Sequence, residues 1–241
     1  MRKGLYAAGL LAAVLWLLAA AAGLVWLTAG DGGLMAREML KHAPPEATGL
    51  PEAEYGGAAE MTVGYLTGRT QTFQYYLTGE DGATYACFQP HEAAHMADCR
   101  ALIGLAGRVC ILCLAALALT GLFPATGRRL WTPEGRRRLG KGMLTGLGIV
   151  LSVAAVLGAW AIEDFDGFFT AFHRIAFTND GWLLNPRTDL LIRLMPTSFF
   201  VALGTRGALL FLPAVLLTAG TAAALVRSGT RKRKEKTADE L

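Results

Sequence analysis

Long apolar runs alternate with polar segments along the chain, and this pattern predicts four membrane-spanning helices. Crossing a bilayer takes about 20 mostly apolar residues. Four stretches reach this length, at about residues 5–29, 101–123, 143–162 and 199–226. The first run continues well beyond the apolar core of a signal peptide, so we interpret it as an uncleaved anchor. We therefore expect a single integral membrane domain over residues 1–241.

Polar segments between the spans predict two outer loops, at about 30–100 and 163–198, and one inner loop at about 124–142. The first outer loop is long enough for a small cap. Its start, residues 31–55, is rich in Gly, Pro and Glu and predicts irregular chain, whereas residues 58–66 have helical spacing. Residues 72–77 and 84–88 flank a Gly-containing turn and predict a short β-hairpin.

A further helix is expected from His91, because Pro90 suits the first helical position, and it should continue without a break into the second span. The second outer loop is dense in aromatic residues and predicts an interfacial re-entrant segment. The predicted fold class is therefore an all-α membrane protein with a small extracytoplasmic cap that contains a β-hairpin.

The basic residues predict which polar segments lie inside the cell. Fourteen of the 23 Lys and Arg lie before the first span, in the loop at 124–142 or in the tail at 227–241. The positive-inside rule places these three segments, and so both termini, in the cytoplasm. Fifteen of the 19 Asp and Glu lie in the outer loops. The basic tail is then the flank of a span, and no nucleic-acid partner is expected.

Composition agrees with a membrane protein, because 53% of the residues are hydrophobic and the mean hydropathy is +0.38. Of the four cysteines, Cys110 and Cys113 lie inside an apolar span, where small packing residues are the ordinary explanation. Cys87 and Cys99 lie in the first outer loop, and whether they form a disulfide stays open.

The segment His91-Glu92-x-x-His95 has the spacing of a zinc metalloprotease box. No third ligand follows His95 at the usual distance, and the predicted spans contain no Asp or Glu that could complete a membrane-buried metal site. Pro90 also places His91 in the first helical turn, where it is poorly placed to share a metal with His95. We expect no metal and no cofactor. A zinc protease stays an alternative, as does a non-enzymatic scaffold or transporter component.

Two histidines in different outer loops are the candidate catalytic residues. Glu92, His95 and Asp98 share one helix just before the second span. His173 lies in the other outer loop, also near carboxylates. A neutral histidine is a suitable general base near pH 7. The remaining outer-loop histidine, His42, is expected at the surface.

Two arginines inside the predicted spans extend this candidate site. Arg108 and Arg206 each lie about seven residues from the outer end of a span, which is roughly 10 Å below the outer surface. A charge at that depth is costly, so each side chain should snorkel outward or face a polar cavity.

A long motif in the second outer loop carries a resemblance to a known family. It runs from Phe172-His173-Arg174 through Asn179-Asp180-Gly181-Trp182 and Asn185-Pro186-Arg187-Thr188-Asp189 to Met195-Pro196 and Phe199-Phe200. Together with Glu92-x-x-His95-Met96-x-Asp98 and the four-span layout, it is similar to the lipoprotein intramolecular transacylase (Lit) family, a bacterial membrane family formerly listed as uncharacterised. The resemblance covers nearly the whole chain.

The resemblance implies a reaction, a substrate and a location. Members of this family move the sn-2 acyl chain of a diacylglyceryl-cysteine lipoprotein to the α-amino group of that cysteine. The product is a lyso-form lipoprotein, and no acyl-donor cofactor is needed. The partners would be diacylglyceryl-modified lipoproteins and membrane lipids. The protein would lie in the bacterial cytoplasmic membrane, with its active site on the extracytoplasmic side.

The resemblance also implies roles for the candidate residues. His95 would be the leading base, oriented by Glu92 or Asp98, and His173 would stabilise the oxyanion or protonate the leaving oxygen, although the two roles could be exchanged. Supporting residues would be Arg108, Arg206, Asn179, Asp180 and Trp182. Within this pattern His91 is incidental, and Cys99 stands where a small aliphatic residue is expected.

Overall fold

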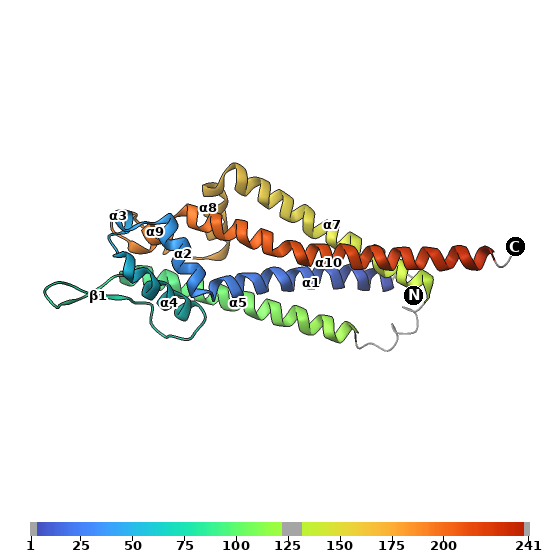
Figure 1. The fold of residues 1–241 in the computed structure, drawn as a ribbon, viewed down its shortest axis with the longest axis horizontal. Coiled ribbons are helices and arrows are strands. Elements are labelled where there is room, and N and C mark those ends of the chain that lie inside the picture. Colours follow the sequence, from blue (N-terminus) through green and yellow to red (C-terminus); the bar gives the residue numbers. More distant parts are fainter. Residues whose placement is uncertain (1–3, 122–131, 239–241) are drawn as a thin grey trace. The chain divides into compact units, whose positions relative to one another are not determined.

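Helices make up most of the protein, whose computed structural model describes residues 4–121 and 132–238, with side chains described for 4–119 and 132–230 (Figure 1). In chain order the elements are α1 (Gly4–Ala29), α2 (Gly32–His42), α3 (Pro45–Thr48), η1 (Glu52–Glu54), α4 (Tyr55–Leu66), β1 (Tyr76–Thr78), β2 (Thr84–Ala86), α5 (Pro90–Gly121), α7 (Pro133–Glu163), α8 (Phe165–Ala176), α9 (Leu190–Leu194) and α10 (Thr197–Ala238). Part of the predicted inner loop, residues 124–131, lies outside the described residues.

Four helices, α1, α5, α7 and α10, are long and apolar enough to cross a membrane. They coincide with the four predicted spans and confirm a multi-pass helical membrane protein. Helix α5 starts at Pro90 and runs on without interruption, which confirms the predicted helix from His91 into the second span. Helix α7 begins ten residues before the predicted span, where the Thr132 hydroxyl accepts a hydrogen bond from the Gly135 N–H at 3.0 Å.

The chain packs as two compact units. The first contains Met1–Gly23, Arg108–Ala159 and Leu210–Leu241, and the second contains Leu24–Gly107 and Trp160–Leu209. In the first unit, glycines let helices approach closely. A Cβ on Gly142 would lie 2.0 Å from the Tyr6 carbonyl oxygen, and one on Gly140 would lie 2.7 Å from the Ala222 carbonyl oxygen. Small residues at such contacts allow helix backbones to pack tightly in membranes.

Substitution of Gly142 by alanine should therefore disrupt the packing of α1 against α7. The added methyl group overlaps the Tyr6 carbonyl, and overpacking of this kind costs about 1–3 kcal/mol. We expect a lower thermal unfolding midpoint in detergent micelles. Gly148→Ala, in the same helix, is the matched control, because a Cβ there meets no described atom within 4 Å. Equal midpoints for the two variants would contradict this account of the helix contact.

The second unit has a hydrophobic core formed by α2, α4, α5, α9 and the start of α10. The prediction of irregular chain at 31–55 is wrong, because this stretch folds into α2, α3 and η1. Leu34, Met35 and Met39 recur at helical spacing and are buried. Asp31 caps α2 by accepting a hydrogen bond from the Leu34 N–H at 2.9 Å. Burial of one apolar face thus outweighs the local Gly and Pro signals.

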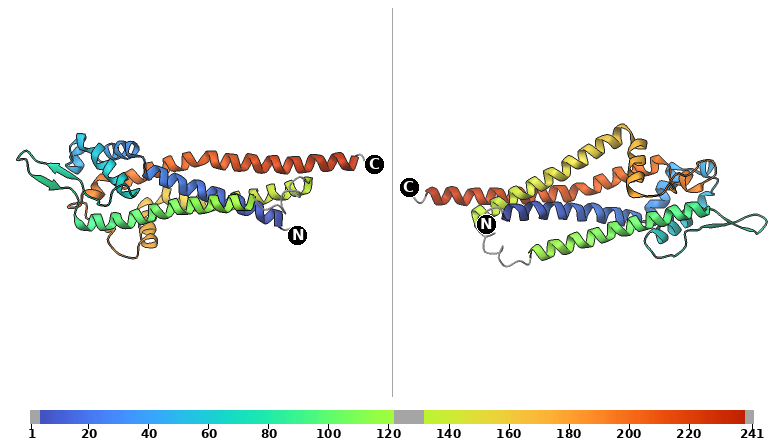
Figure 2. Two further views of the ribbon diagram at one scale, coloured as in Figure 1. Left: turned by 90° about the horizontal axis from the view of Figure 1, so that it is seen from below. Right: turned by 180° about the vertical axis from the view of Figure 1, so that it is seen from behind.

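The predicted β-hairpin is confirmed, although its first strand begins later than expected. Strands β1 and β2 pair antiparallel, with Tyr76 opposite Ala86 and Leu77 opposite Tyr85. Gly82 in the connecting turn has a φ of +75°, a conformation that glycine adopts without steric cost. The hairpin projects away from the helices of its own unit in all views (Figure 2).

Helices α8 and α9 form from the aromatic second loop that was predicted to be an interfacial re-entrant segment. Asp164 caps α8 by accepting a hydrogen bond from the Gly167 N–H at 2.9 Å. His173 lies in the last turn of this helix and is buried. The cap of α8 and its packing therefore determine where the second candidate histidine is held.

Candidate active site

His95 and His173 meet in the second unit although 77 residues separate them in the chain. Their ring centroids are 5.9 Å apart, with an interplanar angle of 31°. The side chains come from α5 and α8, and the two residues are only 7% and 6% exposed. The tertiary structure thus brings together the two histidines that the sequence analysis selected as catalytic candidates.

Aromatic rings surround the His173 imidazole. The ring centroids of Phe169 and Trp182 lie 4.2 Å and 5.0 Å from it, and that of Phe177 lies 5.5 Å away. Phe177 also packs edge-on against His95 at 5.3 Å. Trp182, which the family motif marked as a supporting residue, is therefore a wall of this site. The imidazole pair lies in an apolar setting where electrostatic interactions are stronger than in water.

A hydrogen bond to the backbone determines which nitrogen of His173 carries the proton. Its Nδ1 lies 2.7 Å from the Phe169 carbonyl oxygen, which can only accept a hydrogen bond. Nδ1 must therefore carry the proton, and Nε2 of the neutral ring is left as an acceptor. Burial lowers the pKa of His173 below its ordinary value of 6.5, and the bond to Phe169 offsets only part of this effect. The ring is consequently neutral near pH 7.

His95 has a different set of contacts. Its Nε2 lies 3.5 Å from the Cys99 Sγ, one helical turn further along α5. Its Nδ1 is buried and has no hydrogen-bond partner among the described residues. A buried nitrogen without a partner is costly in a structural role, so it is the natural point of contact with a substrate.

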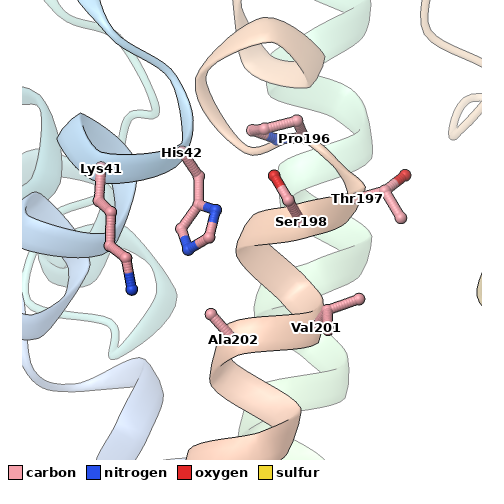
Figure 3. Close-up of a pocket in the computed structure, with 7 residues that line it drawn as sticks. All are labelled: Lys41, His42, Pro196, Thr197, Ser198, Val201 and Ala202. Carbon is pink, nitrogen blue, oxygen red and sulfur yellow. The ribbon is translucent and has the colours of Figure 1, made fainter. Parts of the chain in front are cut away.

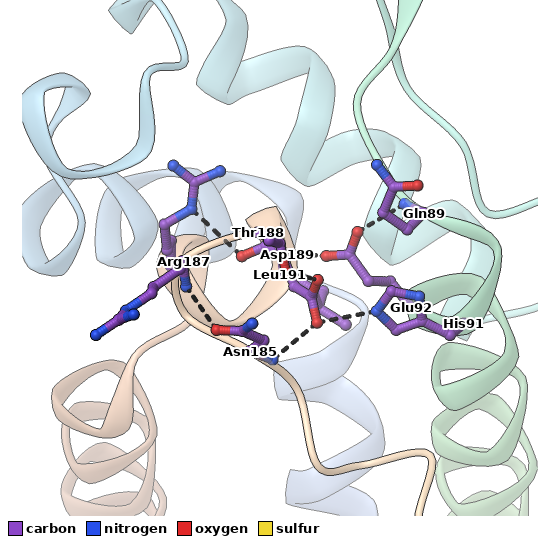
Figure 4. Close-up of polar contacts among 9 residues, drawn as sticks. Gln89, His91, Glu92, Asn185, Arg187, Thr188, Asp189 and Leu191 are labelled. Atoms are coloured by element: carbon purple, nitrogen blue, oxygen red, sulfur yellow. Dashed lines mark hydrogen bonds and ion pairs between the residues drawn. The ribbon is translucent and has the colours of Figure 1, made fainter.

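The carboxylates that were expected to orient His95 bind elsewhere. Asp98 accepts a hydrogen bond from the Asn179 side-chain amide at 2.9 Å, and so connects α5 to the segment after α8. Glu92 accepts hydrogen bonds from the Gln89 and Leu191 N–H groups, both at 2.6 Å (Figure 4). Neither carboxylate is bonded to an imidazole. Asp180 is exposed at the turn after α8.

Glu92 is fully buried and joins two helix N-termini. Gln89 directly precedes α5, so its bond to Glu92 is half of a capping box. Leu191 lies in the first turn of α9, whose N–H groups also lack partners within the helix. A single carboxylate thus connects the two outer loops.

His91 and Asp189 form a second connection between these loops, which the sequence did not predict. The His91 Nε2 lies 2.9 Å from the Asp189 Oδ2, which also accepts a hydrogen bond from the Asn185 N–H at 2.8 Å (Figure 4). Burial alone would raise the pKa of Asp189, but the hydrogen bonds from His91, Asn185 and Thr188 outweigh it and lower the pKa below 3.8. No local signal in the sequence marks this pair.

His91 and His95, the two histidines of the apparent zinc box, thus contact different partners. Among the described residues, no group of three or more His, Cys, Asp or Glu side chains is arranged to hold a metal ion. All four cysteines are free.

The ion pair predicts a pH dependence of stability. Histidine ordinarily titrates at about pH 6.5, so His91 is protonated and the pair is charged below that value. Asp189, with its lowered pKa, stays ionised down to below pH 3.8. The hydrogen bond to Asp189 raises the pKa of His91 above 6.5, so His91→Ala should lower the unfolding midpoint most at about pH 5–6 and progressively less as the pH rises through that raised pKa. A midpoint difference that does not change with pH would contradict the ion pair.

One of the two span arginines shares a unit with the histidine pair, and the other does not. Arg206 belongs to the second unit and Arg108 to the first. Both side chains are exposed. Their part in stabilising charge stays a prediction.

A pocket of about 660 Å³ lies between the end of α2 and the start of α10 (Figure 3). Its lining residues are Lys41, His42, Pro196, Thr197, Ser198, Val201 and Ala202. Neither His95 nor His173 is among the described residues that line it. The pocket is therefore separate from the histidine pair.

His42 was expected at the surface, but it is partly buried and lies 3.4 Å from Glu38 on the same helix.

The fold is thus that of a multi-pass helical membrane protein, with two imidazoles buried among aromatic rings in its second unit. The model of the family described as lipoprotein intramolecular transacylase Lit matches residues 9–200. The chain belongs to this family, and it is an acyltransferase that modifies lipoproteins. This confirms the resemblance seen in the sequence.

Solved structures show the same fold. The membrane integral lipoprotein intramolecular transacylase Lit from Bacillus cereus is 17% identical, with a TM-score of 0.66 over 98% of each chain. A structure of the Bacillus cereus protein with a histidine-to-arginine substitution is 16% identical, with a TM-score of 0.64 over 98% of this chain and 95% of that one. One with a histidine-to-alanine substitution has a TM-score of 0.60 at 17% identity, over 97% and 96%. No curated protein matches the sequence.

Proposed function

We propose that this protein moves the sn-2 acyl chain of a diacylglyceryl-cysteine lipoprotein to the α-amino group of that cysteine, and that His173 transfers the proton while His95 binds the oxyanion. The observation that supports this site is the buried imidazole pair, with ring centroids 5.9 Å apart, built from two different outer loops. Donor and acceptor groups belong to one substrate molecule, so no separate acyl donor is required.

The reaction needs one proton acceptor and one proton donor. The amine nitrogen attacks the ester carbonyl carbon, a C–N bond forms, and the bond between that carbonyl carbon and the sn-2 oxygen breaks, so the oxygen stays on the glyceryl group. The amine loses a proton and the departing sn-2 oxygen gains one, so the overall proton balance is zero. Two neutral imidazoles can catalyse this exchange if the bare nitrogen of one takes the amine proton and then returns it to the leaving oxygen, while the N–H group of the other binds the oxyanion.

The hydrogen bond to Phe169 favours His173 as the acceptor, because it leaves Nε2 without a proton. His95 then donates a hydrogen bond from its unpartnered Nδ1 to the oxyanion, and the His173 imidazolium returns the amine proton from Nε2 to the leaving oxygen. The sequence analysis had His95 as the leading base and left the exchange of roles open. The structure supports the exchanged roles.

The aromatic rings that line the site favour transfer of the acyl chain to the amine over its transfer to water. Phe169, Phe177 and Trp182 surround the His173 ring. Water in the site would hydrolyse the ester, whereas an amine tethered to the same glyceryl-cysteine benefits from a high effective concentration.

Titration of His173 predicts the shape of the pH–rate profile. The substrate amine titrates at about 7.7–8.0, so log(kcat/KM) should rise with unit slope up to that pH. The pKa of His173 lies below 6.5, so the slope should steepen to about two only below pH 6.5. Purified enzyme and a synthetic diacylglyceryl-cysteine lipopeptide provide the measurement. A slope of two already at pH 7 would contradict a neutral His173.

We further infer that the protein acts in the bacterial cytoplasmic membrane on its extracytoplasmic side, because the loops that carry both histidines hold most of the acidic residues and the basic residues flank the opposite ends of the spans. Expression in a host that makes diacylglyceryl lipoproteins, followed by mass spectrometry of their N-terminal peptides, tests the activity. Peptides with an unmodified amine would overturn the proposal.

A further inference from the structure

Cys99 contacts His95, the member of the histidine pair whose proton position no backbone hydrogen bond determines. The Sγ atom lies 3.5 Å from the His95 Nε2, within the range of a sulfur hydrogen bond. His95 is 7% exposed, and its other nitrogen has no partner among the described residues. The thiol is therefore the only described side chain that is hydrogen-bonded to a nitrogen of the His95 ring.

A neutral imidazole has one N–H and one bare nitrogen, so a partner at one position determines the other. If the thiol donates its S–H to Nε2, the ring proton must lie on Nδ1. If the thiol accepts from an Nε2–H, then Nδ1 is bare. A thiol is a weak donor and a weak acceptor, and burial disfavours its ionisation to the thiolate.

The arrangement of His173 selects between these two possibilities. Its Nε2 is already the acceptor of the pair, because Nδ1 donates to Phe169. A second bare nitrogen on His95 would leave the site with two acceptors and no donor for the oxyanion. Two protonated imidazoles at a centroid distance of 5.9 Å in an apolar site would repel each other.

We propose that Cys99 is a positioning residue for acyl transfer: its thiol donates to Nε2 of His95 and so keeps the imidazole proton on Nδ1, where the oxyanion of the reaction is bound. The effect of Cys99 on catalysis rests on the proposed function. The hydrogen bond itself, and the tautomer that it selects, can be tested in the resting protein.

NMR spectroscopy of the full-length protein in micelles, labelled with ¹⁵N-histidine, tests the tautomer directly. Only four histidines are present, and His95→Asn identifies the signals of His95. We expect a neutral Nδ1–H tautomer for His95 and the same tautomer for His173. In Cys99→Ala the His95 signals should shift toward the Nε2–H form, and those of His173 should not. An Nε2–H tautomer in the wild type, or no change in Cys99→Ala, would overturn the proposal.

Kinetics provide the second readout. Cys99→Ala should lower kcat about two- to tenfold with an unchanged KM, which is the effect of one weak hydrogen bond. Cys99→Ser, which keeps a donor at this position, should recover part of the loss. Cys110→Ala, on the same helix but in the first unit, is the matched control and should keep wild-type kcat.

The acyl-transfer activity and the positioning role of the Cys99 thiol can be contradicted separately. Absence of acyl transfer by the wild type would overturn the proposed function, while the NMR measurement would still decide the role of the thiol. If the wild type is active, and Cys99→Ala has the same kcat and the same His95 tautomer as the wild type, only the positioning role is overturned.

Discussion

Replacing His173 with alanine is expected to slow acyl transfer by about 10²–10⁴-fold, the usual contribution of a general acid or base. The variant lacks the Nε2 acceptor that the hydrogen bond to Phe169 keeps free of a proton. Mass spectrometry of the lipopeptide product measures the loss. The fold should survive, because the imidazole lies at the end of α8 and makes one hydrogen bond to its own helix.

Amide substitutions separate the roles of the two histidines. The amide nitrogen of Asn can replace an Nδ1–H donor, so His95→Asn should keep more activity than His95→Ala. The amide of Gln occupies the Nε2 position but cannot accept a proton, so His173→Gln should be as slow as His173→Ala. The opposite pattern would indicate that His95 is the general base. His42→Ala, on α2 beside Glu38, is the control for a histidine outside the pair.

Replacing Glu92 with alanine is expected to lower the free energy of unfolding by about 3–5 kcal/mol. The two backbone N–H groups of Gln89 and Leu191 would lose a charged acceptor, and hydrogen bonds to charged groups contribute about 1.5–3 kcal/mol each. Thermal or denaturant unfolding in a fixed detergent, followed by circular dichroism, measures the change.

Two further variants make the Glu92 prediction specific. Glu92→Gln keeps one carbonyl acceptor and should lose about half as much stability as Glu92→Ala. Glu80→Ala changes an exposed glutamate of the hairpin turn and should leave the unfolding midpoint unchanged. Equal stability of Glu92→Ala and Glu80→Ala would show that the connection between the outer loops is unimportant.

The membrane helices and the two candidate histidines followed from the sequence, whereas the small helices of the second unit did not. A run of about 20 apolar residues has few alternatives to a spanning helix, so the pattern alone predicts it. Helix α2 has only 11 residues and lies between glycines and prolines. Its stability comes from burying Leu34 and Met39, and such tertiary packing is invisible in a local pattern.

The four spans, the helix from Pro90 into the membrane and the hairpin could be predicted from the sequence, and the two histidines could be selected as candidates, because each depends on a local pattern or on the family motif. Only the tertiary structure decided what each polar group binds. It assigned Glu92 to the Leu191 N–H group and His91 to Asp189, each across about 100 residues of chain. Burial demands a partner for nearly every polar group, and which partner is near depends on how the outer loops pack.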